Sequence, residues 1–592
     1  MVPPAAVASS AAPAPPRIEL PEAALEGEVR RLAASCGITL PVARILLSRG
    51  ITGDAVEPFL TPRLDRMHDP LLLADMERAA TRLADAVVAG EPIGIFADYD
   101  VDGVTSCSLL TELFTACGAT LHRYLPDRLK EGYGLNGHGL EVLAEAGCAV
   151  VVTVDCGINA RGPARRAGEL GLDLIITDHH EVEEPMPEAF AVVNPKRPDS
   201  AYPFREVCGV GVAFNLAVAV RRELTARGHF GDGEPPDLKS LLDIVALGTI
   251  GDMVPLIDVN RAWVRRGLTL INSRGRPAFR ALAHAAGLAN KPLTAGQVAF
   301  QLSPRINALG RLGDPAAGVA LLTSRDPREA EPLAELCQKE NQRRRAIEGR
   351  ILTEAVAQAD AAGGASRRAI VVSSGRWHPG VIGIVASRLV ERYHRPAVVL
   401  AVADETARAS VRSIPGVDIH RVLTGFADRL LNFGGHPYAA GLTVETARID
   451  ELADYLHTTL DGEVAAERWQ RAVRVDSLLR FSEVTLRLME ELKRLEPFGM
   501  GNREPLFLTR GARLTRLRRI GDGSHLAMAV EEGGTTFPGV WFRAGDRIDD
   551  LREAGPLDLV YRLKLDDFRD QLRIQVQIQE VVGAGETPGL QK

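Results

Sequence analysis

The chain contains few cysteines, and none of them forms a recognisable pair. Seven cysteines are scattered over 592 residues without any Cys-x-x-Cys spacing: Cys36, Cys107, Cys117, Cys148, Cys156, Cys208 and Cys337. An odd number of isolated thiols argues against both a disulfide framework and a zinc ribbon. We therefore expect the protein to work in a reducing compartment, the cytoplasm.

Long apolar runs and an excess of positive charge are also missing. No segment approaches the ~18 apolar residues of a transmembrane helix, so no membrane association is expected. Residues 1–16 are rich in Pro and Ala without a basic start or an apolar block, which predicts a flexible tail instead of a signal peptide. The net charge of −7 excludes nothing, because an acidic centre can coexist with locally basic surface.

The most informative stretch is an apolar segment followed by closely spaced acidic residues. Ile93–Ala97 predicts a buried strand, and Asp98, Asp100 and Asp102 come directly after it. Three carboxylates within five residues repel one another unless protons or a cation neutralise them. This stretch alone fits two interpretations equally well, a divalent-metal site or an acidic turn that caps the next helix.

Three further apolar segments favour the metal site. They run into acidic residues or histidines: Ala149–Val154 into Asp155, Leu174–Thr177 into Asp178, His179 and His180, and Ile244–Ile250 into Gly251 and Asp252. Ligand sites in open α/β sheets lie beyond the carboxyl ends of parallel strands. Four such endings with two histidines among them predict a site for a hard or borderline cation.

These motifs together resemble a known superfamily. Asp-Tyr-Asp-Val-Asp-Gly from Asp98, Val-Asp-Cys-Gly from Val154, Asp-His-His from Asp178 and Gly-Asp-Met-Val-Pro-Leu from Gly251 are similar to the motifs of DHH phosphoesterases. Within that superfamily the chain resembles the RecJ family of single-stranded-DNA-specific exonucleases, over roughly residues 50 to 582.

The resemblance implies a two-ion site. It makes Asp100 and Asp102 ligands of one ion each, with Asp155 bridging both ions and with His179 and Asp252 completing one coordination sphere. Asp98 is a further ligand or a partner behind the ligands. His180 is expected to meet the scissile phosphate, and the expected catalytic group is His180, Asp155 and Asp178. Mixed imidazole and carboxylate ligands suit two Mn²⁺ ions, with Mg²⁺ as the alternative.

The predicted organisation is α/β with a C-terminal β-barrel. Apolar segments at 93–97, 119–125, 149–154, 173–177 and 191–194 alternate with helical patterns, which predicts a parallel sheet. With the resemblance, we expect the following parts: a disordered tail (1–20), a helical lead-in packed on the first main domain (21–90), a DHH catalytic domain (91–260), a helical connector (261–362) with one or two long helices from residue 326, a DHHA1 α/β domain (363–465), an OB-type barrel (470–582) and a disordered tail (583–592).

Two segments supply the first candidate substrate contacts. The Gly-rich and charged loop Leu125–Gly139 carries Arg128, which suits a phosphate, although a solvated connection is the plainer interpretation. Ser303–Arg311 is a run that RecJ-like proteins share. It contributes the candidates Arg305, Asn307 and Arg311.

The DHHA1-like region supplies the others. His378 precedes a Gly-rich helix start, whose free N–H groups favour an anion. Ser410 and Arg412 are candidates, with Arg128, for a pocket that reads a terminal phosphate. Gly434, Gly435 and His436 resemble the DHHA1 segment that closes over substrate.

The C-terminal region combines short alternating runs with positive charge. Six arginines stand against two acidic residues between Arg503 and His525, and Arg513, Arg516, Arg518 and Arg519 are the expected DNA contacts. Phe537, Trp541, Phe542 and Tyr561 are candidate stacking faces for bases. An ordinary core with a charged face is the alternative.

The resemblance implies a monomeric 5′-to-3′ exonuclease that releases mononucleotides from single-stranded DNA in recombination and repair. A helicase and a single-strand-binding protein are the partners it implies. Three rivals stay open: a DHH phosphodiesterase for short oligonucleotides or cyclic dinucleotides, a pyrophosphatase, and a non-catalytic DNA-binding scaffold of the Cdc45 type. The complete set of strand-end carboxylates and histidines favours an enzyme over a scaffold.

Overall fold

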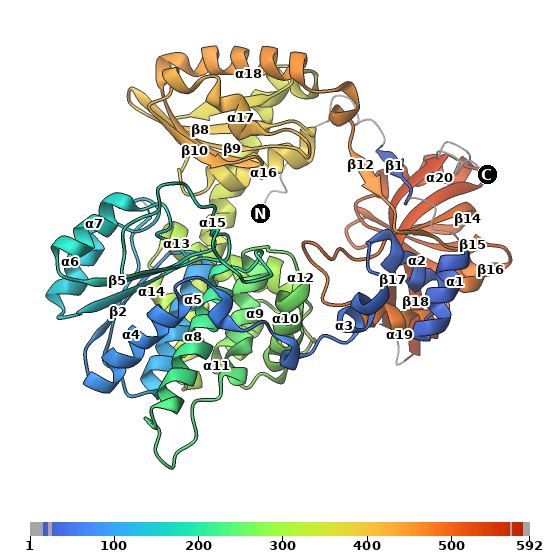
Figure 1. Ribbon diagram of the computed structural model, residues 1–592. Helices are drawn as coiled ribbons and strands as arrows, with labels where there is room; N and C mark the ends of the chain where they lie inside the picture. Colours follow the sequence, from blue (N-terminus) through green and yellow to red (C-terminus); the bar gives the residue numbers. More distant parts are fainter. Residues whose placement is uncertain (1–15, 22–25, 129, 569–570, 584–592) are drawn as a thin grey trace. The chain divides into compact units, whose positions relative to one another are not determined.

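The computed structural model describes residues 16–21, 26–128, 130–568 and 571–583 (Figure 1). The chain divides into two units. One consists of residues 57–345 together with 495–503, and the other of the described residues up to 56, residues 346–494, and those from 504 onward. The predicted tails at 1–15 and 584–592 lie outside the described residues.

A five-stranded, entirely parallel sheet organises the first unit. Its strands lie in the order β3 (Leu121–Tyr124), β2 (Ile93–Ala97), β4 (Val150–Val154), β5 (Asp173–Thr177) and β6 (Ala191–Val193). The five predicted strands are therefore confirmed. Because all strands run in one direction, their carboxyl ends meet at a single edge.

Both faces of this sheet are buried, because alternate residues of each strand enter two separate cores. Val150, Val152 and Val154 of β4 join the larger core, and Val151 joins the smaller one. Figure 1 shows α4 (Met76–Ala89), α5 (Val101–Ala116) and α8 (Gly209–Ala226) on one side and α6 (Gly137–Glu145) and α7 (Arg161–Glu169) on the other. Burial on both faces explains why these strands read as continuous apolar runs.

One predicted strand end is wrong. The apolar segment before Asp252 is not a strand but the buried helix α9 (Leu242–Gly251), which packs on α5 and α10 (Asp258–Ser273). A short, wholly apolar run does not distinguish a buried helix from a buried strand. Asp252 is the C-terminal capping residue of α9.

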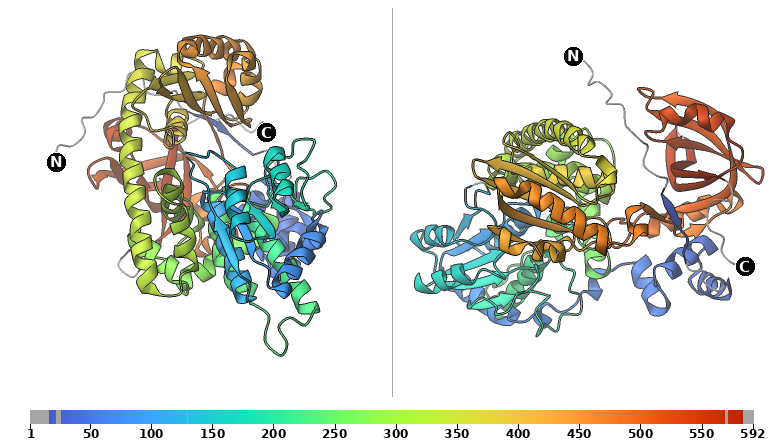
Figure 2. Two further views of the ribbon diagram at one scale, coloured as in Figure 1. Left: turned by 90° about the vertical axis from the view of Figure 1, so that its left-hand side faces the viewer. Right: turned by 90° about the horizontal axis from the view of Figure 1, so that it is seen from above.

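The connector is helical, as predicted. It comprises α10, α11 (Pro277–Ala285), α12 (Ala295–Gln297), the π-helical segment η5 (Val298–Leu302), α13 (Ser303–Leu312), α14 (Ala316–Thr323) and α15 (Pro327–Ala361). Figure 2 shows α15 as one long helix, which confirms the expectation for this stretch.

A mixed five-stranded sheet forms the centre of the DHHA1-like region. The order is β10 (Asn432–His436), β11 (Ala439–Glu445), β9 (Thr406–Arg412), β8 (Ala397–Ala403) and β7 (Ile370–Ser374). Only β7 and β8 are parallel. The same region contains three helices: α16 (Ile382–Tyr393), α17 (Ile419–Thr424) and α18 (Ile449–Glu463).

The C-terminal region is a closed five-stranded barrel. Its strands are β14 (Phe507–Ile520), β15 (His525–Glu532), β16 (Thr535–Trp541), β18 (Gln571–Gly583) and β17 (Leu557–Phe568), and β17 pairs back to β14. The predicted barrel is confirmed.

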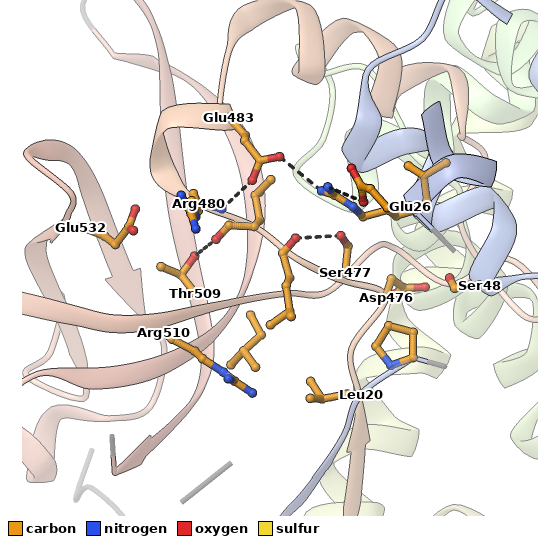
Figure 3. Close-up of a pocket in the computed structure, with 16 residues that line it drawn as sticks. Leu20, Glu26, Ser48, Asp476, Ser477, Arg480, Glu483, Thr509, Arg510 and Glu532 are labelled. Atoms are coloured by element: carbon orange, nitrogen blue, oxygen red, sulfur yellow. Dashed lines mark hydrogen bonds and ion pairs between the residues drawn. The ribbon is translucent and has the colours of Figure 1, made fainter. Parts of the chain in front are cut away.

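The helical lead-in is not one part, and its first half does not pack where we predicted. Helices α1 (Glu26–Cys36) and α2 (Leu40–Ser48) belong to the unit that contains the barrel, whereas α4 belongs to the first unit. Arg44 pairs with Glu483 at 3.2 Å, and Arg49 pairs with the buried Asp476 at 3.0 Å. Figure 3 shows the pocket of about 490 Å³ between these helices and the barrel, with Glu483 among its lining residues.

The first strand also corrects the predicted tail. β1 (Arg17–Glu19) pairs in parallel with β12 (Ala472–Arg474), so residues 17–19 are not disordered. Among the described residues, no single helix is long and apolar enough to cross a membrane. Only α1 and α2, taken together as a pair bent by 112°, meet the length and composition test.

Candidate metal centre and nucleic-acid interface

The loop after β2 places three carboxylates at the carboxyl edge of the parallel sheet. Asp98 follows the strand directly and is buried. Asp100 caps α5, because its Oδ1 accepts hydrogen bonds from the N–H groups of Asp102 at 2.8 Å and Gly103 at 3.2 Å. The helix-capping interpretation therefore describes Asp100 correctly, but it does not account for Asp98 or Asp102.

Asp102 is fully buried and is held by a second helix. Its carboxylate accepts hydrogen bonds from the N–H groups of Gly209 at 2.6 Å and Val210 at 2.8 Å, in the first turn of α8. Helix N-termini stabilise anions. Burial nevertheless raises the pKa of Asp102 well above its usual range, and the nearby charges of Asp252 and Asp100 add to the rise.

Asp155 and His179 connect the carboxylates of different strands. Asp155 follows β4 with a left-handed φ of 62° and is buried. Its Oδ1 lies 3.1 Å from Nε2 of His179, which follows β5. The same His179 nitrogen lies 3.7 Å from an oxygen of Asp102 and 3.7 Å from an oxygen of Asp252.

Three overlapping sets of side chains offer ligand atoms that lie within 4.8 Å of one another. They are Asp98, Asp100 and Asp155; Asp155, His179 and His180; and Asp102, His179 and Asp252. All six residues predicted as metal ligands are among them. Asp155 and His179 each belong to two sets, so the sets form one continuous cluster.

The chemistry of this cluster fits divalent cations. Among the described residues, the buried oxygens Asp98 Oδ1 and Asp155 Oδ1 accept no hydrogen bond. Burial raises the pKa of both carboxyls, and neighbouring carboxylates raise it further. Burial and the charge of Asp100 raise the pKa of Asp252 to about 7. Buried carboxylates in such numbers need protons or cations to neutralise them.

Asp178 lies behind the cluster and orients His180. Its carboxylate accepts hydrogen bonds from the N–H groups of Ile158 and His179, and its Oδ1 lies 2.7 Å from His180 Nδ1. Burial lowers the pKa of His180, but the hydrogen bond and charge of Asp178 outweigh burial and raise it to about 9. For Asp178, burial opposes ionisation, yet its contacts with His180 and the charge of His179 lower its pKa to about 2.

Sequence reasoning missed Tyr133, Gly209 and Gly248. The hydroxyl of Tyr133 lies 3.1 Å from His180 Nε2. A Cβ added to Gly209 would lie 2.7 Å from Asp155 Cβ, and one added to Gly248 would lie 3.1 Å from Asp102 Oδ1. Tyr133 stands within the Gly-rich loop that we singled out for Arg128, which is the one signal that pointed toward it.

The remaining candidates of the first unit lie around the same loop or beneath it. Asn307 Oδ1 accepts a hydrogen bond from the N–H of Val101 at 2.7 Å, so Asn307 supports the loop of carboxylates. The guanidinium carbon of Arg128 lies 5.2 Å from the ring centroid of Tyr99. Burial, followed by the charges of Arg128 and Arg344, lowers the pKa of Arg311 to about 10. Arg305 is buried and donates to the carbonyl of Gln301.

In the second unit, Ser410 and Arg412 lie together beside the start of α16. Arg412 Nη1 donates to Ser410 Oγ at 3.2 Å. A Cβ on Gly383, in the first turn of α16, would lie 2.8 Å from Ser410 Oγ and 3.3 Å from Arg412 Nη2. His378 Nδ1 accepts from the N–H of Gly380 at 3.1 Å, before the helix begins.

The Gly-Gly-His segment is a strand. Gly434, Gly435 and His436 form the end of β10 and pair with β11. Gly435 has a φ of 146°, and a Cβ there would lie 2.4 Å from the carbonyl oxygen of Ala439. The close pairing of the two strands therefore requires glycine at this position.

The four candidate arginines of the barrel are exposed to solvent, but not all of its candidate aromatic rings are. Arg513, Arg516, Arg518 and Arg519 are all exposed on β14, where the strand register shifts between Thr515 and Arg518. Trp541 and Tyr561 are buried, so the expectation that they offer stacking faces is wrong. Tyr561 packs instead against Phe481 and Phe507, and the guanidinium carbon of Arg547 lies 4.7 Å from the ring centroid of Trp541. Phe542 is exposed and Phe537 is partly exposed.

Comparison with known families agrees with the arrangement of these parts. The DHH family, N-terminal domain, matches residues 92–249, the DHHA1 domain matches residues 367–461, and the RecJ OB domain matches residues 475–580. The parallel sheet with its carboxylates, followed by a DHHA1 domain, defines the chain as a DHH-type phosphoesterase.

Individual relatives narrow the class to one family. The single-stranded-DNA-specific exonuclease RecJ of Bacillus subtilis is 36% identical over 94% of this chain and 69% of its own length. The crystal structure of RecJ from Thermus thermophilus in complex with Mn²⁺ has a TM-score of 0.82 and 29% identity, and the match covers 97% of this chain and 80% of that chain. The same protein in complex with Mg²⁺ gives a TM-score of 0.77 with 27% identity, over 97% and 79%. The chain belongs to the RecJ family.

Proposed function

We propose that this protein is a metal-dependent, single-stranded-DNA-specific exonuclease. It removes mononucleotides in the 5′-to-3′ direction by hydrolysing phosphodiester bonds. The observation that carries the proposal is the position of Asp155, which belongs to a carboxylate set with Asp98 and Asp100 and also lies 3.1 Å from His179 of the adjoining set. A carboxylate shared in this way suits two ions a few ångströms apart.

The residues that would hold these ions divide between the two ends of the cluster. Asp98 and Asp100 would hold one ion, Asp102, His179 and Asp252 the other, and Asp155 would bridge them. Two Mn²⁺ ions suit this mixture of carboxylate and imidazole better than Mg²⁺, which prefers all-oxygen octahedra. Bound divalent ions activate water and offset negative charge on a phosphoryl group.

The side chains around the cluster would orient the phosphodiester. His180 is fixed by Asp178 at 2.7 Å and carries positive charge near neutral pH, as its pKa of about 9 indicates. It is therefore suited to a non-bridging oxygen of the scissile phosphate. Arg311 and Arg128 supply positive charge near Asp100 and Tyr99, where the strand would pass.

Selection of a 5′ end requires a site for the terminal phosphate. In the DHHA1 domain, Ser410 and Arg412 lie 3.2 Å apart beside the first turn of α16, which supports the proposal that they bind a phosphate group. Arg513, Arg516, Arg518 and Arg519 of the barrel would hold the strand through its phosphates. His378 and the Gly434–His436 strand are proposed to contact the nucleotide being removed.

An enzyme of this specificity depends on other proteins for unpaired DNA. We propose a helicase and a single-strand-binding protein as its partners, a role in recombination and repair, a monomeric state, and the cytoplasm as its location. Seven cysteines, none of them in a disulfide, suit a reducing compartment.

The test is digestion of single strands labelled at the 5′ or the 3′ end, with Mn²⁺ present and a duplex control. We expect early release of the 5′ label as mononucleotide, no digestion of the duplex, and no digestion by Asp155→Ala protein. Cleavage of di- to pentanucleotides alone would instead indicate a small-substrate phosphodiesterase. Binding of strands without any cleavage would indicate a scaffold.

A further inference from the structure

Tyr133 and Asp178 both contact the His180 imidazole. Asp178 Oδ1 lies 2.7 Å from His180 Nδ1, and the Tyr133 hydroxyl lies 3.1 Å from Nε2 and 3.4 Å from Nδ1. An imidazole held by both groups cannot turn about its Cβ–Cγ bond without losing one of these contacts. The Asp178 contact by itself leaves the Nε2 end of the ring unsupported.

The Tyr133 ring is itself held in place by aromatic contacts. It meets the His180 ring edge-to-face with centroids 5.9 Å apart, and it meets Tyr99 edge-to-face at 6.3 Å. Tyr99 is buried and lies in sequence between the metal-site carboxylates Asp98 and Asp100. Tyr133 therefore connects His180 to the loop that carries the metal-site carboxylates.

The backbone around Tyr133 is shaped to bring this side chain back over the site. Gly132 and Gly134 flank it with φ values of 87° and 86°, a conformation that residues with side chains rarely adopt. Tyr133 is also 58% exposed, so its ring supports little of the protein core. An exposed tyrosine between two left-handed glycines is poorly explained by stability alone.

We propose that Tyr133 is a positioning residue for His180 in phosphodiester hydrolysis, an inference that rests on the proposed function. Its hydroxyl fixes the imidazole before the substrate arrives and occupies the place that a phosphoryl oxygen takes at His180 Nε2. When the phosphate binds, its oxygen replaces the hydroxyl at Nε2 of the imidazole that Tyr133 has positioned. Tyr133 contributes through the orientation of His180 toward the reacting phosphate, so the loss of its hydroxyl slows turnover more than it weakens strand binding.

The kinetic test compares Tyr133→Phe, His180→Ala and the double variant on a 5′-labelled single strand with Mn²⁺. Removing one hydrogen bond of this kind should lower kcat about tenfold while KM changes less than about twofold. Because Tyr133 acts through His180, adding Tyr133→Phe to His180→Ala should cause no further loss. Tyr393→Phe is the matched control. The Tyr393 hydroxyl donates a hydrogen bond to Asp360 at 2.7 Å, and both residues are far from Tyr133 in the sequence.

Three kinetic results would overturn the proposal: unchanged kcat in Tyr133→Phe, a raised KM with unchanged kcat, or full additivity with His180→Ala. A second measurement does not need the reaction. In ¹⁵N-histidine-labelled protein, Tyr133→Phe should shift the Nε2 resonance of His180, whereas Tyr393→Phe should leave it in place. If the wild-type protein cuts no DNA, the proposed function fails, and this spectrum still decides whether Tyr133 holds His180. An unmoved resonance would refute that contact.

Discussion

The Asp102 carboxylate and the Gly209 N–H form a hydrogen bond of 2.6 Å across 107 residues of sequence. This bond joins the first turn of α5 to the first turn of α8 in the centre of the carboxylate cluster. The approach is so close that a Cβ at position 209 would lie 2.8 Å from Asp155 Oδ1 and 2.9 Å from Asp102 Oδ2. The geometry of two proposed metal ligands thus depends on a residue that has no side chain.

We expect Gly209→Ala to reduce Mn²⁺-dependent exonuclease activity at least about a hundredfold, because misplacement of reacting groups by about 1 Å is that costly. Mn²⁺ affinity, measured by isothermal titration calorimetry, should fall with it. Gly168→Ala is the control, since Gly168 lies in α7 and a Cβ there would meet nothing within 4 Å. Normal activity in Gly209→Ala would mean that α8 moves freely away from the cluster.

The raised pKa values predict that Mn²⁺ affinity increases with pH. The pKa of Asp252 is raised to about 7 by burial and by the charge of Asp100, so this carboxyl must lose a proton before it can bind an ion. Below pH 7 the apparent affinity should rise about tenfold per pH unit for each proton released, and it should level off above that pH. Calorimetry in two buffers of different ionisation enthalpy would count the protons. Binding that does not change between pH 5.5 and 7.5 would contradict the prediction.

The same shift has the opposite effect on the metal-free protein. A carboxyl with a raised pKa contributes its stability fully below its unfolded value near 4 and loses it as the pH rises through about 7. The thermal midpoint without Mn²⁺ should therefore fall between pH 5 and 7 through this group, while the increase caused by Mn²⁺ becomes larger. Asp252→Asn should flatten both trends.

The exposed arginines of β14 predict a dependence on strand length and salt. Replacing Arg513, Arg516 and Arg518 by Gln should weaken binding of long single strands, and it should reduce the dependence of log affinity on log salt by about 0.7 for each phosphate that the barrel no longer neutralises. Cleavage of short oligonucleotides should change less, because a short strand offers the barrel few phosphates. Arg448→Gln is the control, a partly exposed arginine outside the barrel that pairs with Glu445 at 2.9 Å. An unchanged salt slope would exclude the barrel from strand binding.

The parallel sheet and its acidic edge were predictable because their signals are local. A strand buried on both faces produces an apolar run, and the chemistry follows the run directly, as Asp155 follows β4 and Asp178 follows β5. α9 was misjudged because a buried helix of ten residues produces the same apolar run. Asp252 was nevertheless identified as a proposed ligand, since its position depends on the end of the run and not on the type of element.

Features that depend on distant pairs could not be predicted in this way. The packing of α1 and α2 rests on contacts such as that of the Thr39 N–H with Glu491 of α19 (Leu486–Arg494), at 2.7 Å and 452 residues away in sequence. Tyr133 shows no motif of its own, and its role becomes visible only when β5 brings His180 to it. Trp541 and Tyr561 looked like stacking faces because sequence does not tell the inside of a barrel strand from its outside when both faces are mixed.

Arg261 illustrates the same difficulty for charge, because in the sequence it stands among several arginines between residues 261 and 280. It is instead 1% exposed and donates to the carbonyls of Phe59 at 2.8 Å, Leu495 at 3.0 Å and Glu496 at 2.8 Å. Its guanidinium also lies 4.1 Å from the ring centroid of Phe59. Arg261 thereby anchors the start of residues 495–503, which precede the barrel in sequence but belong to the unit of the parallel sheet.

Arg261→Ala should therefore lower the free energy of unfolding of this unit by about 3 kcal/mol, because three carbonyls, that of the buried Leu495 among them, lose their donor. Urea denaturation would measure the change, and limited proteolysis should show earlier cleavage near residues 495–503. Arg280→Ala, a change at an exposed arginine of the same helical region, is the control and should alter stability by less than about 0.5 kcal/mol. If Arg261→Ala were instead as stable as the wild type but bound DNA more weakly, Arg261 would be a DNA contact and the structural role assigned to it would be wrong.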